Sequence, residues 1–154
     1  MRTSLLPSML HTISFNENKK NFNIKLFEIS KIYQKASNIS EGILPEEIEM
    51  LQMALTKQKE SNKEKEKYSG MGYVNDPIFE FKSDVLRLLT VLGLNGAEIE
   101  NHTENNSFHK GKCAVIKKGR DIIGTFGAVN PRILSNFDIK QDVYVLELNL
   151  EKIL

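Results

Sequence analysis

Residues 1–33, MRTSLLPSMLHTISFNENKKNFNIKLFEISKIY, predict a helix that leads into a long apolar strand, and this pair organises the rest of the chain. Four apolar residues recur at the spacing i, i+3, i+4 and i+7 of one helix face: Leu6, Met9, Leu10 and Ile13. Pro7 stands where a first-turn proline is tolerated. We therefore expect an amphipathic helix over about residues 5–18, ended by an asparagine-rich turn.

The second half of this stretch, residues 23–33, is dense in β-branched, aromatic and other apolar side chains. That density is too high for a solvated helix, and it favours a strand that is buried on most of both faces. We expect this strand to lie in the centre of a sheet.

The composition is that of one ordinary domain. The chain has 154 residues, of which 40% are hydrophobic and 27% are charged, enough to bury a real core. Lys and Arg number 21 against 20 for Asp and Glu. The net charge of +1 gives no general attraction to nucleic acid or to anionic membranes.

The single cysteine, Cys113, cannot form an internal disulfide, and Pro7 interrupts the apolar run near the N-terminus that a signal peptide would need. A reducing, cytoplasmic compartment is therefore expected.

Residues 36–47 are rich in Ser, Asn, Gly and Pro and predict a loop. The next apolar run is ambiguous. Pro45 with two following glutamates resembles a helix start, and Ile48, Leu51 and Leu55 fit one helix face. The alternation of Leu51, Met53 and Leu55 fits a strand equally well, so the residues alone leave both structures open.

Residues 57–75 are expected to form a flexible loop within the domain. Lys57–Lys67, KQKESNKEKEK, holds five lysines and three glutamates with no apolar anchor to offset the entropy of ordering. RNA binding by these lysines is the less favoured interpretation, because the glutamates cancel most of the field and no aromatic residue lies among them. Gly70 and Gly72 lack a preceding strand and a third glycine, which argues against a nucleotide fingerprint.

The remaining chain alternates strands with two proline-initiated helices. Asp76–Pro77 and Asn130–Pro131 predict helix starts, with stops at Gly93 and about Phe137. The other expected elements are a short strand at 97–102, a polar loop at 103–112, a hairpin of 113–117 with 122–129 around Gly119, and a strand at 143–150. The fold class is α+β, with five or six mostly antiparallel strands and two main helices on one face.

No residue pattern indicates chemistry. The three histidines, His11, His102 and His109, lack the spacing of a zinc site. We expect Cys113 to be a small buried hydrophobic residue. Only Arg2, of the four arginines, lies near the long strand of residues 23–33. We therefore predict no catalytic, cofactor-binding or metal-ligating residue in this module.

Five segments, in order, resemble a known family. They are RTSLLPSMLHTI with LFEISKIY, FEFKSDVLRLLTVLGL, FHKGKCAVI, IGTFGAVNPRIL and VYVLELNLEKIL. Together they are similar to the β chain of bacterial phenylalanine–tRNA ligase, over nearly the whole sequence. Ser83, Lys110 and Asn130 depart from its usual Gly, Pro and His, at positions that we expect on loops or helix surfaces.

The resemblance implies the module that copies the class II synthetase catalytic core, an antiparallel sheet flanked by helices, without catalysing. It implies a strand at about 49–57. In the related catalytic α chain the matching strand ends in an arginine that binds ATP. The corresponding residue here is Gln34, which has neither the positive charge nor the bidentate geometry of a guanidinium. The Phe-His-Gln-x-Glu signature of that chain is also missing from residues 36–56.

By the same resemblance, residues 1–154 are one module of a longer protein that has an editing domain upstream and an anticodon-binding domain downstream. The expected role is to scaffold the α subunit in a heterotetramer, with ATP and Mg²⁺ used by the whole enzyme and tRNA(Phe) bound by other domains. Two alternatives stay open: a free-standing paralogue that activates a small acid with ATP, and a local RNA-binding module that uses Lys57–Lys67.

Overall fold

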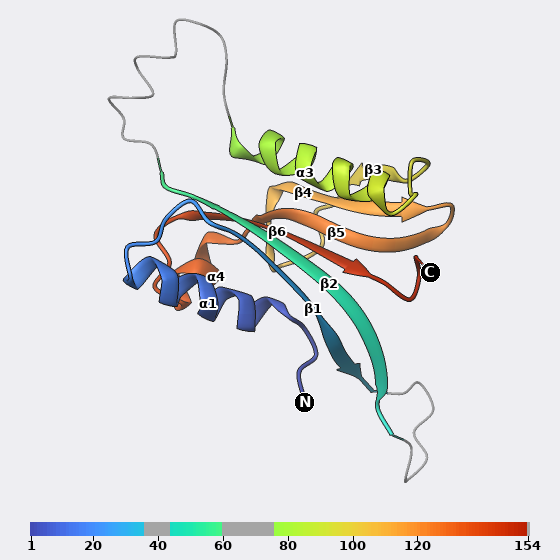
Figure 1. Ribbon diagram of the computed structural model, residues 1–154, viewed down its shortest axis with the longest axis horizontal. Helices are drawn as coiled ribbons and strands as arrows, with labels where there is room; N and C mark the ends of the chain where they lie inside the picture. Colours follow the sequence, from blue (N-terminus) through green and yellow to red (C-terminus); the bar gives the residue numbers. More distant parts are fainter. Residues whose placement is uncertain (36–43, 60–75, 154) are drawn as a thin grey trace, which may run out of the picture.

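The computed structural model describes residues 1–35, 44–59 and 76–153. Its helices are α1 (Leu6–Asn18), α3 (Pro77–Val91) and α4 (Pro131–Asn136). Its strands are β1 (Lys25–Gln34), β2 (Glu46–Lys57), β3 (Glu98–Asn101), β4 (Phe108–Lys118), β5 (Asp121–Val129) and β6 (Asp142–Asn149). The strands form one sheet in the order β1-β2-β6-β5-β4-β3, and every neighbouring pair is antiparallel (Figure 1). The predicted α+β class is confirmed.

The helices cover opposite faces of the sheet. α3 packs through Phe81, Val85 and Leu89 on one face, hereafter the α3 face. α1 and α4 pack on the other, the α1 face (Figure 1). The expectation that both main helices share a face is wrong. Ala54 faces α1 while Leu55 faces α3, and alternation along a strand buries both faces of the central strands.

The position predicted for the strand of residues 23–33 is also wrong. Among the described strands β1 lies at the edge of the sheet and pairs with β2 alone, and its exposed and half-buried residues alternate from Lys25 to Lys31. Phe27 is 75% exposed and Ile29 is 52% exposed. A high apolar content predicts that a segment forms a strand. It does not reveal whether a helix of the same chain covers each face of that strand.

The ambiguous segment is a strand, as the family resemblance implies. β2 pairs with β1 on one side and β6 on the other, which makes it one of the buried strands of the sheet. The spacing of Leu51 and Leu55 is compatible with a helix and with a strand. The hydrogen bonds of this segment to a strand on either side make it a strand, and tertiary context of this kind regularly overrides a local helix start.

The proline-initiated helices are confirmed. The Asp76 carboxylate accepts a hydrogen bond from Ile78 N at 3.1 Å, and Asn130 Oδ1 accepts one from Arg132 N at 3.0 Å. The hairpin of β4 and β5 is confirmed as well, with Gly119 at φ +63° in its turn. A positive φ costs a glycine little, which explains the residue at this position.

The remaining predictions are partly met. The polar loop expected at 103–112 is shorter, because β4 begins at Phe108, and Lys110 is therefore a strand residue rather than a loop residue. The loop predicted at 36–47 gives way to β2 at Glu46. Lys57 belongs to β2, whereas the rest of the lysine-rich loop beyond residue 59, with Gly70 and Gly72, lies outside the described residues.

Candidate functional site

The position singled out by sequence, Gln34, lies at the end of β1 and is exposed. Its side chain borders a pocket of about 210 Å³ on the α1 face, next to the N-terminal end of α1. The lining residues are Thr3, Ser4, Leu5, Ile32, Gln34, Met50, Leu51, Gln52 and Glu147. This pocket is the candidate site, and we call it the Gln34 pocket.

Two of the lining residues, which the sequence analysis did not single out, are polar and face each other across two strands. Gln52 on β2 stands directly opposite Glu147 on β6 in the antiparallel register. Gln52 Nε2 donates to Glu147 Oε1 at 3.0 Å, and Ser4 Oγ donates to the same oxygen at 3.4 Å. Burial raises the pKa of Glu147, while the two hydrogen bonds act in the opposite direction.

Gln52 is fully buried, and its amide oxygen has no hydrogen-bond partner within the described parts of the chain. The sequence carried a signal for this pair. Each is a polar residue with an apolar residue on both sides in the sequence, and a polar side chain in such a run needs a hydrogen-bond partner if it is buried.

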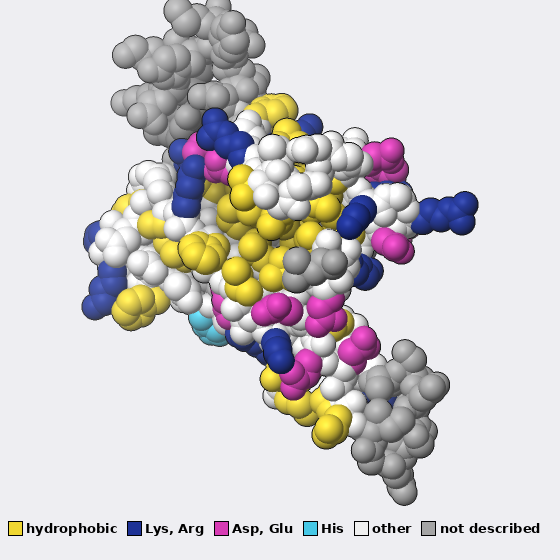
Figure 2. All heavy atoms as spheres, turned by 45° about the vertical axis from the view of Figure 1, so that its right-hand side comes forward, with side chains coloured by type: hydrophobic (Ala, Val, Ile, Leu, Met, Phe, Trp, Pro, Cys, Tyr) yellow, Lys and Arg dark blue, Asp and Glu magenta, His cyan; other side chains and the backbone are white. Residues whose placement is uncertain are grey.

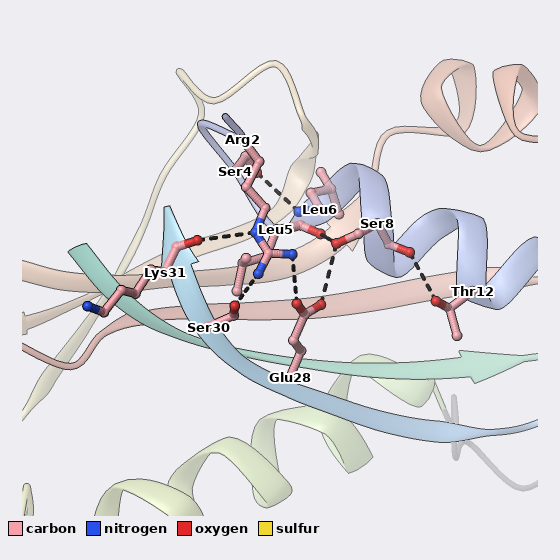
Figure 3. A network of polar contacts seen from close by, with 9 residues as sticks. All are labelled: Arg2, Ser4, Leu5, Leu6, Ser8, Thr12, Glu28, Ser30 and Lys31. Atoms are coloured by element: carbon pink, nitrogen blue, oxygen red, sulfur yellow. Dashed lines mark hydrogen bonds and ion pairs between the residues drawn. The ribbon is translucent and has the colours of Figure 1, made fainter. Parts of the chain in front are cut away.

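Arg2 does not line the Gln34 pocket. It instead ties the start of the chain to β1, where its guanidinium donates to Glu28 Oε1 at 2.9 Å, to the Lys31 carbonyl oxygen at 3.1 Å and to Ser30 Oγ (Figure 3). Its carbonyl oxygen also accepts a hydrogen bond from Tyr33 N at 2.9 Å, which covers part of the free edge of β1.

The pocket lining does not fit a polyphosphate. Nucleotide phosphates need converging Lys or Arg side chains, and no Lys or Arg belongs to the lining as the described residues form it. Gln34 is neutral, and Glu147 would repel a phosphate when it is ionised. No step of ATP chemistry can be assigned to these side chains.

The histidines and the cysteine are placed in separate parts of the fold. The His11 ring contacts the Phe137 ring edge to face with centroids 4.9 Å apart, and His109 Nδ1 accepts a hydrogen bond from Gly111 N at 3.1 Å. Cys113 is buried, and burial raises its pKa to about 11, which suits an inert core residue. Across the described ranges, no three His, Cys, Asp or Glu residues gather as a metal site would need.

A larger hollow of about 760 Å³ lies beside α4 and the start of β6. Its lining includes the basic residues Lys59, His109, Lys112 and Lys140 and the acidic residues Asp138 and Asp142. Two of the basic residues have acidic partners: Lys112 pairs with Asp76, and Lys59 Nζ lies 4.0 Å from Asp142 Oδ1. The hollow therefore has no strong excess of charge to attract an anion.

The α3 face of β1 is an apolar surface that α3 leaves uncovered. Phe27 stands opposite Met53 and Ile29 opposite Leu51, and Leu51 and Met53 belong to the core under α3. α3 contacts the start of β1, where Lys25 Nζ lies 2.7 Å from Asp84 Oδ2. On the side of the molecule drawn in Figure 2, hydrophobic side chains form one continuous area with acidic side chains along its lower border.

The helices that the structure describes include none with the length and apolar character needed to cross a membrane.

Comparison with solved structures places the same fold in a synthetase. The pyrrolysyl tRNA synthetase PylSc of Desulfitobacterium hafniense superposes with a TM-score of 0.69 at 16% identity, covering 99% of this chain and 48% of that chain. The antiparallel synthetase-like core implied by the sequence resemblance is therefore confirmed as a fold.

Comparison with curated sequences finds phenylalanine–tRNA ligase beta subunits. That of Clostridium acetobutylicum is 32% identical over 154 residues, all of this chain and 17% of the relative. That of Streptococcus pneumoniae strain R6 is 33% identical over 153 residues, 99% of this chain and 18% of the relative. The chain thus spans less than a fifth of the length of these relatives. The model of the phenylalanyl tRNA synthetase beta chain CLM domain matches residues 1–150, and the chain belongs to this family.

Proposed function

We propose that this chain is a core module of a phenylalanine–tRNA ligase β subunit, and that it docks on the catalytic α subunit instead of catalysing. The observation that carries the proposal is the exposed apolar surface around Phe27 and Ile29 on the edge strand. Neighbouring apolar residues at these exposures on a free sheet edge are typical of a surface that a partner covers. The name of the relatives, a beta subunit, supplies the kind of partner.

The Gln34 pocket supports the non-catalytic half of the proposal. As the described residues form it, its lining holds one carboxylate and no Lys or Arg, whereas activation of an amino acid with ATP needs cationic groups on the phosphates. In the whole enzyme, ATP and Mg²⁺ would act on the α subunit, tRNA(Phe) would bind other domains of the β subunit, and the complex would be a cytoplasmic heterotetramer. The module would hold the assembly in place.

The test is co-purification of the α subunit with the complete β subunit that contains this chain. The double variant Phe27→Ser with Ile29→Ser should weaken assembly at least about tenfold, because it removes buried apolar area from the contact. Phe15→Ser is the matched control, since Phe15 is 63% exposed but lies on α1, on the other side of the sheet.

Equal assembly of the double variant and the control would contradict the docking surface. Assembly that survives deletion of the whole module would contradict the scaffold role. ATP–pyrophosphate exchange by the module alone would contradict its non-catalytic nature, and we expect none.

A further inference from the structure

The hydrogen bonds of Arg2 show which residues of β1 direct their backbone groups away from β2, toward what we call the outer edge. Tyr33 N donates to the Arg2 carbonyl oxygen at 2.9 Å. The Lys31 carbonyl oxygen accepts from Arg2 Nε at 3.1 Å (Figure 3). In an antiparallel strand the N–H and C=O of one residue point to the same edge, and the edge changes with each residue. Because the register with β2 has no shift from Lys25 to Gln34, the odd-numbered residues of β1 face the outer edge.

The outer edge is open where Arg2 does not cover it. Phe27 and Ile29 are odd-numbered, so the N–H and C=O groups of both residues point outward. Within the described ranges, no backbone or side-chain group hydrogen-bonds to them on that side. A row of outward N–H and C=O groups on an edge strand is a template for pairing with another extended segment.

The same two residues expose apolar side chains, and the charges beside them are already paired. Phe27 and Ile29 are exposed on the α3 face. Charged side chains, above all lysines, are a common means of keeping further strands away from an edge. The lysines that flank this stretch, Lys25 and Lys31, each lie 2.7 Å from a carboxylate of their own chain. The stretch between them therefore offers open backbone groups beside uncharged, apolar side chains.

We propose that an extended segment of the α subunit pairs with the outer edge of β1 at Phe27 and Ile29 and adds a further strand to the sheet. This inference rests on the proposed docking function and specifies how the docking surface is bound. A helix satisfies its backbone groups internally, so an extended segment is the partner that supplies matching donors and acceptors. Alternate side chains of the added strand lie beside Phe27 and Ile29 on the α3 face, which requires the segment to be apolar at every second position.

The test compares two substitutions at Ile29 in the complete β subunit, assembled with the α subunit. Ile29→Ala removes apolar side-chain area, whereas Ile29→Pro also removes the outward N–H and places a ring where the added strand approaches. Proline is tolerated on an edge strand where its missing N–H faces outward, so the pairing with β2 is kept. We expect Ile29→Pro to weaken assembly at least about tenfold more than Ile29→Ala, because a backbone partner in the added strand is left unsatisfied.

The matched control is the same pair of substitutions at Asn101, on the strand at the opposite end of the sheet. His102 N donates to the Cys113 carbonyl oxygen of β4, so the N–H of the preceding residue, Asn101, points away from β4. Asn101→Pro and Asn101→Ala should assemble equally with the α subunit. Thermal unfolding of each complete β subunit shows whether the variant is folded.

Amide hydrogen exchange in the assembled wild-type enzyme tests the same hydrogen bonds without a substitution. Glu28 N faces β2, whereas Phe27 N and Ile29 N face the outer edge. We expect the amides of Phe27 and Ile29 to exchange at least about a hundredfold more slowly than those of an unstructured peptide, as the amide of Glu28 does. Mass spectrometry with electron-transfer fragmentation resolves the three residues.

Photocrosslinking from p-benzoylphenylalanine in place of Phe27 identifies the occupant. A crosslink to an α-subunit peptide is expected, and a crosslink to a second copy or to another part of the β subunit would overturn the assignment. Rapid exchange of the Phe27 and Ile29 amides, or equal assembly of folded Ile29→Pro and Ile29→Ala, would overturn strand addition and leave docking through the apolar side chains in place. Failure of docking itself is recognised separately, by equal assembly of the Phe27→Ser with Ile29→Ser double variant and its control.

Discussion

Arg2 Nη1 lies 2.9 Å from Glu28 Oε1 and so joins the segment that leads into α1 to the edge strand β1 (Figure 3). Glu28 also accepts a hydrogen bond from Ser8 Oγ on α1 at 3.4 Å. One carboxylate therefore connects the chain start, the first helix and the sheet. Because β2 is the one strand of the described part of the chain that pairs with β1, these contacts help to hold the other edge of β1 against the helix.

Replacing Arg2 by Lys should lower the free energy of unfolding by about 1 kcal/mol, since a lysine cannot bind Glu28, Ser30 and the Lys31 carbonyl together. The value is modest because both partners of the ion pair are partly exposed. Urea unfolding measures it. Arg120→Lys, at an exposed position in the β4–β5 turn, is the control. An equal decrease in unfolding free energy in the two variants would show that the hydrogen bonds of Arg2 do not stabilise the fold.

Replacing Asp76 by Ala should cost about 1–2 kcal/mol of unfolding free energy. The Asp76 carboxylate caps α3 through Ile78 N, and it also accepts hydrogen bonds from Lys112 Nζ and Tyr144 Oη. Thermal and urea unfolding measure the loss. Asp121→Ala, at the exposed start of β5, should have little effect.

The contribution of Asp76 should depend on pH. Burial alone would raise the pKa of Asp76, but the hydrogen bonds from Lys112, the Ile78 backbone and Tyr144, with the charge of Lys112, hold it below its usual value. The stabilisation is therefore present above the unfolded-state pKa of about 4 and is lost as the pH falls through the lower folded-state pKa. Unfolding of the wild type and Asp76→Asn should differ at pH 7 and converge in acid. A constant difference would contradict the ionic contribution.

Replacing Glu147 by Gln should stabilise the isolated chain at neutral pH. The pKa of Glu147 is raised by burial, so the folded state holds its proton more tightly than the unfolded state does. The wild type then loses stability as the pH rises from about 4 through the folded-state pKa of Glu147. The variant does not lose this stability, because glutamine does not ionise. Urea midpoints from pH 4 to pH 8 measure it. A variant that is less stable than the wild type at pH 8 would contradict a charge left without a cationic partner.

Replacing Gly127 by Ala should destabilise the sheet by about 1–3 kcal/mol, because a β-carbon there would collide with the Lys112 carbonyl oxygen and lie 2.8 Å from Cys113 Cα. Gly127 stands opposite Cys113, beside a register shift in β4. Gly96→Ala is the control, since a β-carbon at Gly96 meets nothing within 4 Å. Similar thermal midpoints for both variants would show that β4 can shift to make room.

Local sequence patterns were sufficient to predict a structural feature where that feature depends on the properties of one or two neighbouring residues. The Asp76–Pro77 and Asn130–Pro131 starts and the Gly119 turn were predicted correctly, because side-chain caps, a fixed proline φ and a positive glycine φ act within a few residues. The helix period of residues 6–13 also held, since it needs one buried face and no specific partner.

Local patterns failed where the outcome depended on a distant segment. The residues at the start of β2 resemble a helix start in sequence, but pairing with β1 and β6 makes the segment a strand. The Gln34 pocket was missed for the same reason. Nothing near Gln52 in the sequence indicates that Glu147 stands opposite it, although the two are directly paired across β2 and β6.

The sequence by itself determined the elements of residues 1–33 and their order, because the helix period, the turn residues and the β-branched run are local properties. Through its ordered motifs it also determined the family, which the match over residues 1–150 confirms. Only the tertiary structure decided that the strand ending at Gln34 is an edge strand with Phe27 exposed, and that Gln52 and Glu147 share one pocket. Strand order and helix placement depend on which surfaces bury the most apolar area together, and that sum runs over the whole chain.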